Sequence, residues 1–172
     1  MRFAHSDLVF LVFLFLHIGG AIVAFGPTFV LSMIGAMGGR EPQFANFAAR
    51  ISGAIEHRLV VPLAIFVGIT GVGLIWTSHR DIFRDTWLLL SIVLYLIALS
   101  VSIFVAVPLN HQLVGATAGP PPALPAEAYQ GPGPAGPPPH IAGLVKRSQM
   151  VGMVLALLLV SILLLMVFKP TL

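Results

Sequence analysis

The sequence has no cysteine, which excludes disulfides, thiolate metal sites, iron–sulfur clusters, covalently attached c-type haem and palmitoylation. Charge is scarce too: only 9% of the residues are Asp, Glu, Lys or Arg, whereas a soluble domain carries about 25%. Nine basic and six acidic side chains cannot cover the surface of a water-soluble domain of 172 residues. We therefore expect lipid to be the main solvent of this chain.

Recognised catalytic motifs are absent as well. The sequence contains no phosphate-binding P-loop, no HExxH zinc motif, no GxSxG nucleophile elbow and no dinucleotide fingerprint. Whether the protein is an enzyme therefore stays open. The net charge of +3 comes from basic residues scattered among the loops, and they form no cluster that would neutralise phosphates. This distribution excludes nucleic acid as a partner.

Four long stretches without charge are the main feature that the sequence does contain. They predict membrane spans at about 8–36, 59–77, 87–108 and 148–168, because a helix of about 20 apolar residues crosses a hydrocarbon core of about 30 Å. Lipid forces each span to satisfy its backbone polar groups internally, which favours helix. We predict an all-α fold, a four-helix transmembrane bundle that makes residues 1–172 a single transmembrane domain.

The first apolar run is too long for a typical signal-peptide core, so we expect it to be retained as a span. An even number of spans places both termini on one side of the membrane. Basic residues are nearly balanced between the two sides, so the positive-inside rule leaves the orientation undecided.

Two segments between the spans differ from them in composition. In residues 42–58 apolar side chains recur at near-helical spacing from Phe44 to Ile55, opposite the charged residues Arg50 and Glu56. This pattern predicts an interfacial amphipathic helix. Residues 115–143 hold most of the 14 prolines together with many Gly and Ala residues. That composition predicts a Pro/Gly-rich disordered loop, a flexible connector outside the bilayer.

Three prolines fall inside or beside the predicted spans. Because proline lacks the amide hydrogen of a helical residue, Pro27 is expected to kink the first helix or to end its regular part. Pro62 is expected to mark a bend near the membrane surface, and Pro108 to close the third span together with Asn110.

His17 is the ionisable residue that lies well inside a predicted span. A charged group there would cost about 2.5 kcal/mol or more, so the imidazole should be neutral and face protein. Three roles stay open at this point: a hydrogen bond between helices, a ligand to haem iron or another metal, and a group that transfers protons.

A polar collar is predicted where the second helix begins and the third ends. The residues expected at this interface are Glu56, His57, Arg58, Asn110 and His111. Basic side chains there could bind the propionates of a haem whose iron lies near His17. The predicted cofactor-binding residues are therefore His17, His57, His111 and Arg58, with His17 as the iron ligand. The alternative is a solvated or structural collar with no ligand.

Small and hydroxyl-bearing residues recur at helical spacing in the second and third spans. In the third span a stripe that includes Ser91, Tyr95 and Ser102 is expected to face inward and to hold helices together by hydrogen bonds. In the second span Gly68 and Gly71, with neighbouring small residues, are expected to let the backbone of another helix approach closely.

Three short stretches carry a family resemblance: residues 15–20 (FLHIGG), 25–27 (FGP) and 165–170 (LMVFKP). They resemble a family of small bacterial predicted integral membrane proteins of unknown function. More distantly, the setting of His17 in a first helix, followed by small residues, is similar to membrane proteins of the copper-resistance D type and the protoporphyrinogen-oxidase J type. The resemblance implies a multi-pass protein of the bacterial inner membrane and, through the J type, b-type haem at His17.

The leading functional hypothesis is a membrane protein that binds b-type haem or a related redox centre through His17. Such a protein would support electron transfer or a quinone- or porphyrin-linked oxidation. One alternative is a non-catalytic accessory or assembly subunit of a larger membrane complex, and another is a small transporter. The lipid bilayer is the expected surrounding, and the sequence leaves open whether the chain forms a homo-oligomer or joins a larger complex.

Overall fold

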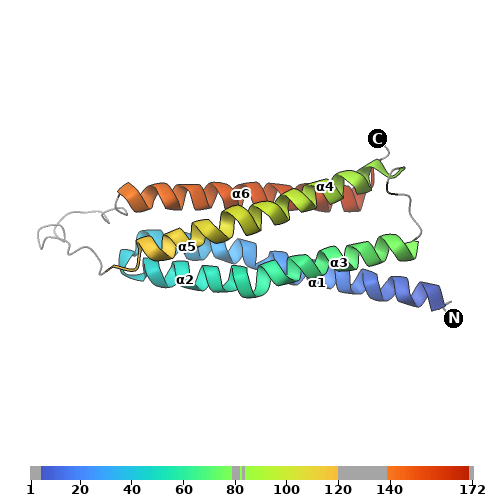
Figure 1. The fold of residues 1–172 in the computed structure, drawn as a ribbon, viewed down its shortest axis with the longest axis horizontal. Helices are drawn as coiled ribbons and strands as arrows, with labels where there is room; N and C mark the ends of the chain where they lie inside the picture. Colours follow the sequence, from blue (N-terminus) through green and yellow to red (C-terminus); the bar gives the residue numbers. More distant parts are fainter. Residues whose placement is uncertain (1–4, 79–81, 83, 120–138, 171–172) are drawn as a thin grey trace, which may run out of the picture.

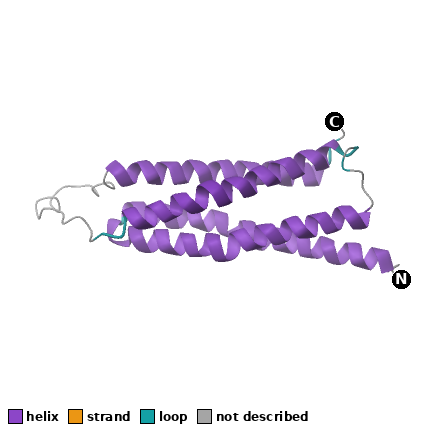
Figure 2. Cartoon of the chain, viewed as in Figure 1, coloured by secondary structure: helices purple, strands orange, loops and turns teal. Residues whose placement is uncertain are grey.

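A computed structural model describes residues 5–78, 82, 84–119 and 139–170 of the chain. Within these ranges the regular structure is helical throughout, with no strand (Figures 1 and 2). The predicted all-α fold is thereby confirmed. The α-helices are α1 (His5–Arg40), α2 (Ala45–Ile55), α3 (Val61–Ser78), α4 (Thr86–Val101), α5 (Val107–Ala116) and α6 (Pro139–Phe168).

These helices join into longer rods that could cross a membrane. Within the described residues, four such candidate spans are found: Asp7–Gly38, Ala45–Ser78, Thr86–Ala116 and Ile141–Phe168. They contain 28 to 34 residues each, so at about 1.5 Å per residue they are about 42 to 51 Å long. Each rod is therefore longer than a hydrocarbon core of about 30 Å.

The start of α1 and the end of α6 lie at the same end of the bundle (Figure 1), as an even number of spans predicts. Counting about 20 residues from that end reaches Thr28 on the first rod, Arg58 on the second and Ser148 on the fourth. The remaining parts of the rods extend past this level.

The helix predicted at the interface is α2, and it runs in line with α3 (Figure 1). The second rod is consequently continuous from Ala45 to Ser78. The ends of the Pro-rich segment are also helical, since α5 continues to Ala116 and α6 begins at Pro139. Residues 120–138, to which most of the predicted disordered loop belongs, lie outside the described residues.

Three prolines lie within helices that continue past them, and two of these prolines follow a π-helical turn. A π-helical turn occupies Glu56–Val60 (η2) just before Pro62, and a second one occupies Ser102–Ala106 (η3) just before Pro108. Proline cannot donate to the carbonyl four residues earlier and its ring presses on that carbonyl, and a π turn relieves both problems by loosening the hydrogen-bond ladder. The expected end of the third span at Pro108 is therefore wrong, and α1 likewise runs through Pro27.

The rods associate in pairs. The main partner of α1 is α3, and the main partner of α4 is α6 (Figure 1). The two pairs contact each other chiefly through α2 with α5 and through α1 with α6. Large apolar side chains cover the outside, for example Phe15, Trp76 and Phe104, each 75% exposed. In water such a surface would be unfavourable, whereas against lipid tails it is expected.

The last helix ends at a defined cap. Lys169 adopts a positive φ of 44°, and its backbone N–H donates to the carbonyl of Leu165 at 3.0 Å. Pro170 follows and cannot continue a helix. The Lys169 ammonium lies 5.8 Å from the centre of the Trp87 ring at the start of α4, within reach of a cation–π interaction. The closing Lys-Pro pair thus ends α6 and ties it to α4.

Candidate functional site

The imidazole of His17 projects from α1 onto α3. Its Nδ1 lies 2.9 Å from the carbonyl oxygen of Val67 and 3.3 Å from the hydroxyl oxygen of Thr70. Because a carbonyl oxygen can only accept, Nδ1 carries the proton and donates. A neutral imidazole with its proton on Nδ1 keeps a lone pair on Nε2. His17 therefore faces protein, as predicted. The lone pair of its other ring nitrogen, Nε2, is not used in a hydrogen bond among the described residues and could coordinate a metal.

Thr70 completes this arrangement from the interior of α3. It is 2% exposed, and its hydroxyl lies 3.0 Å from the carbonyl oxygens of both Phe66 and Val67, to which it donates. Its oxygen can at the same time accept from Nδ1 of His17. In the part of the chain that the structure describes, no buried side-chain polar atom lacks a hydrogen-bond partner. Nε2 of His17, for which no partner is found there, is consequently not fully enclosed.

Glycines of α3 make room for side chains from neighbouring helices. A Cβ on Gly71 would lie 3.2 Å from Cε1 of His17, a Cβ on Gly73 would collide with the ring of Phe13, and a Cβ on Gly68 would press on the Tyr95 hydroxyl. The expected partner of these glycines was a helix backbone. The structure shows aromatic and imidazole rings there instead. Each ring occupies the space that a side chain at the glycine position would take.

The hydroxyl stripe on α4 faces inward, as predicted. Ser91 is 1% exposed and donates to the carbonyl of Trp87 at 2.7 Å. Tyr95 donates from its phenol to the carbonyl of Ala64 on α3 at 2.9 Å. Tyr95 thus links the α4–α6 pair to the α1–α3 pair, the packing role that the sequence suggested.

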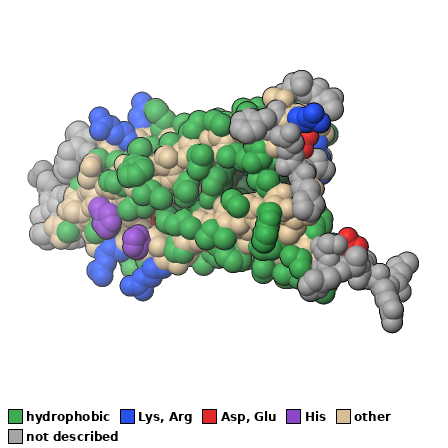
Figure 3. Space-filling model, turned by 45° about the vertical axis from the view of Figure 1, so that its right-hand side comes forward, with side chains coloured by type: hydrophobic (Ala, Val, Ile, Leu, Met, Phe, Trp, Pro, Cys, Tyr) green, Lys and Arg blue, Asp and Glu red, His purple; other side chains and the backbone are tan. Residues whose placement is uncertain are grey.

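The predicted collar residues do not meet His17. His57, Arg58 and His111 are exposed, and Arg58 lies thirteen positions before Gly71 on one continuous rod, which corresponds to about 20 Å along the axis. The collar residues lie in the half of the bundle where α2 touches α5, since Gly53 abuts Asn110. Lys, Arg and His side chains gather toward the ends of the bundle with an apolar band between them (Figure 3).

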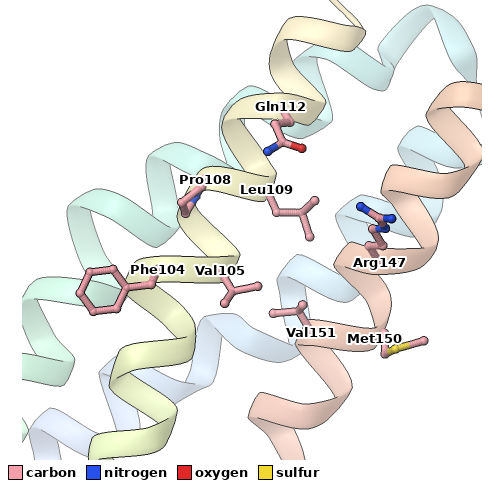
Figure 4. A pocket seen from close by; sticks show the side chains of 8 residues that line it. All are labelled: Phe104, Val105, Pro108, Leu109, Gln112, Arg147, Met150 and Val151. Atoms are coloured by element: carbon pink, nitrogen blue, oxygen red, sulfur yellow. The ribbon is translucent and has the colours of Figure 1, made fainter.

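A small hollow lies between the η3–α5 segment and α6. It has a volume of about 330 Å³, and Leu109 and Gln112 face Arg147 and Val151 across it (Figure 4). Most of its lining is apolar, and the one ion on it, Arg147, is exposed to solvent.

A larger cavity lies in the half of the bundle remote from His17. It measures about 840 Å³ and is lined by all four rods, a size typical of small-molecule sites. Among its lining residues Glu56 is the one that carries a formal charge. The collar hypothesis had grouped Glu56 with exposed residues. The available signal was its position: Glu56 falls one turn after Ser52 and two turns after Ala48 on one face of a helix.

The number of metal-ligating side chains near His17 limits which cofactor the site could hold. Among the described residues, no group of three or more His, Asp or Glu side chains gathers in a way that could hold a metal ion. His17 is therefore a single side-chain donor. This suits a cofactor that brings most of its own ligands, as haem does, and does not suit a bare ion.

Comparison with known protein families gives a match over most of the chain. The family model described as "Predicted integral membrane protein (DUF2269)" matches residues 11–170. No curated protein and no solved structure matches the chain. The matched region includes the first-helix histidine, most of the first candidate span, all of the other three and the closing Lys-Pro pair. The chain therefore belongs to the DUF2269 family of predicted integral membrane proteins.

Proposed function

We propose that this integral membrane protein binds a b-type haem, or a related redox centre, and that Nε2 of His17 would hold its iron. The observation that carries the proposal is the 2.9 Å hydrogen bond from Nδ1 to the carbonyl of Val67. Metal-bound histidines in proteins commonly donate their other ring nitrogen to a backbone carbonyl or carboxylate, which fixes the tautomer and the ring orientation. His17 has this arrangement already within the chain.

The neighbours of His17 support the same role. Val67 and Thr70 hold the proton on Nδ1, so the Nε2 lone pair is available without any rearrangement. Gly71 lets the imidazole lie close to α3. When bound, haem would supply one-electron chemistry, and the contribution of the chain would be to orient the imidazole and to surround it with apolar side chains.

The collar takes no part in this proposal. His57, His111 and Arg58 had been expected to bind the cofactor with His17, but about 20 Å of helix separates Arg58 from the imidazole. We therefore propose His17 as the ligand that this chain supplies, and we assign the three collar residues to the charged end of the bundle. Groups other than the collar residues would supply the remaining contacts to the haem.

Absorption spectroscopy tests the proposal. The protein would be expressed with added 5-aminolevulinate and purified in detergent, and the expected result is a Soret band. His17→Ala should abolish the band, whereas His111→Ala, which removes an exposed histidine at the other end, should retain it. Imidazole added to His17→Gly should restore the band if Nε2 is the ligand. A wild-type protein that shows no Soret band after expression and after reconstitution with haem would contradict the proposal.

A second candidate is a non-catalytic accessory or assembly subunit. The observation that favours it is that the same hydrogen bond already serves a packing role between α1 and α3. In that case His17→Ala would lower the unfolding temperature and the yield while the wild-type protein showed no cofactor spectrum at all. The spectrum of the wild-type protein therefore separates the two candidates.

A further inference from the structure

We propose that the cavity between the four rods binds an organic cation, a small molecule with an ammonium group on an apolar body, and that Glu56 pairs with the ammonium group. This site lies in the opposite half of the bundle from His17. It is independent of the haem proposal.

The cavity exists because small side chains face one another across it. With a volume of about 840 Å³, it could enclose a compact organic molecule. Apolar and small residues make up most of its wall, and hydroxyl and amide groups interrupt that wall. Representative small residues from the separate rods are Gly35, Ala49, Ala106 and Gly152.

Glu56 gives the cavity its charge preference. It is half-buried, and it has neither a hydrogen bond nor an ion pair among the described residues. No buried side-chain polar atom among the described residues lacks a hydrogen-bond partner, so the unpaired carboxylate keeps some contact with water. A partly desolvated carboxylate is stabilised by a positive charge beside it, so a ligand that brings one would gain an ion pair there. An anionic ligand would be repelled, and a neutral one would leave the carboxylate unpaired.

Some polar groups of the cavity wall already form hydrogen bonds within the protein. The amide nitrogen of Asn46 donates to the carbonyl of Val114 and to the hydroxyl of Thr117, both at 3.1 Å. The hydroxyl of Ser32 donates to the carbonyl of Phe29 at 2.7 Å. These groups shape the wall and leave Glu56 as the strongest acceptor that faces the space.

The inner end of the cavity coincides with the two π-helical turns. Glu56 begins η2 and Ser102 begins η3, and both residues line the cavity. π turns of this kind are frequent at functional sites, because they turn side chains away from their regular helical directions. Glu56 lies 22 positions before Ser78, the other end of its rod, and about 20 apolar residues are enough to cross a hydrocarbon core. A cation could therefore reach the carboxylate from the water-facing end.

Three probes with one body and different head groups test the charge preference. Phenylbutylamine, phenylbutanol and phenylbutyrate would be titrated calorimetrically into the full-length protein in phosphatidylcholine nanodiscs, with empty nanodiscs subtracted. The amine is expected to bind about tenfold more tightly than the alcohol, as a charged hydrogen bond predicts, and the carboxylate is expected not to bind. Equal affinity for amine and alcohol, or no binding of the amine at millimolar concentration, would overturn the proposal.

Glu56→Gln provides the matched variant, because it keeps the shape of the side chain and removes its charge. It should reduce the affinity for the amine to that for the alcohol and leave the alcohol unaffected. Glu41→Gln is the control, since Glu41 is exposed and lies outside the cavity wall. Amine binding that survives in Glu56→Gln would overturn the assignment.

Ala106→Phe offers a second route if Glu56→Gln does not give monodisperse protein. The larger side chain would occupy the cavity, and binding of both amine and alcohol should fall together. Undiminished binding of the amine to Ala106→Phe would place its site elsewhere. Neither variant touches His17, so a missing Soret band and a missing amine site are separate results.

Discussion

The two halves of the bundle contain the same kinds of small residue, but the interior of one half is packed and the interior of the other holds a cavity. Around His17, the glycines of α3 receive the rings of His17, Phe13 and Tyr95. Around Glu56, the small residues of four rods face a cavity of about 840 Å³. The difference lies in what stands opposite each small residue, a ring in the first half and another small residue in the second. A stripe of small residues thus permits either close packing or an open site.

The largest loss of stability is expected where an aromatic ring occupies the space beside a glycine. Gly73→Ala would drive a methyl group into Phe13, and overpacking of this kind costs about 1 to 3 kcal/mol. Thermal unfolding in detergent should show a clear loss of stability. Gly35→Ala is the matched control in the other half, because nothing lies within 4 Å of its added Cβ.

A compensating change sharpens that test. Phe13→Leu combined with Gly73→Ala should recover part of the lost stability, because the smaller side chain frees the space that the new methyl group needs. If Gly35→Ala destabilised the protein as much as Gly73→Ala does, the contrast between the halves would be wrong.

Removing the imidazole should have the next largest effect on stability. His17→Ala deletes the hydrogen bond to Val67 and the contact with Gly71, for which we expect a loss of about 1 to 2 kcal/mol. The measurement is again the unfolding midpoint in detergent. His111→Ala should leave that midpoint unchanged, because His111 is exposed; equal losses in the two variants would remove the special role of His17.

A smaller effect is expected for the bond between the helix pairs. Tyr95→Phe removes the hydrogen bond to the carbonyl of Ala64 and keeps the ring against Gly68. Interhelical hydrogen bonds in membranes contribute about 0.6 kcal/mol on average, so the unfolding midpoint should fall slightly. Ser161→Ala is a suitable control, because its hydroxyl donates within its own helix on an exposed face.

The smallest effect is expected from enlarging a residue of the cavity wall. Ala106→Leu should change the free energy of unfolding by less than about 1 kcal/mol, because the added atoms enter open space. Ala98→Leu, on the same rod but 7% exposed and inside the packed region, should destabilise the protein more. A larger loss for Ala106→Leu than for Ala98→Leu would mean that the cavity is closed in the membrane.

The sequence predicted the features that depend on one helix at a time. Long charge-free runs gave the all-helical fold and the four candidate spans, since lipid imposes helix on any such run. The cost of a charge in the bilayer placed His17 against protein, and the period of the helix placed Ser91 and Tyr95 inward. Each of these inferences needs only the chain and its solvent.

Features that depend on how two helices face each other could not be predicted from the sequence. Pro108 was expected to close the third span, but the π turn before it lets the rod continue, and no pattern predicted the matching π turn before Pro62. Glu56 was assigned to an exposed collar because no pattern in a single helix reveals that three other rods stand back from it. For the same reason, the ring partners of the α3 glycines emerged only from the structure.

Cysteine labelling tests the contrast between the two halves most directly, because the natural chain contains no cysteine. Ser52→Cys would place a thiol on the cavity wall one turn from Glu56, and Ser91→Cys would place one in the packed half. Ser52→Cys should react with a water-soluble methanethiosulfonate, faster with the cationic trimethylammonium reagent than with the anionic sulfonate reagent, and Ser91→Cys should be protected from both. Equal protection of the two thiols, or faster reaction of Ser52→Cys with the anionic reagent, would contradict an open, cation-selective half beside a closed one.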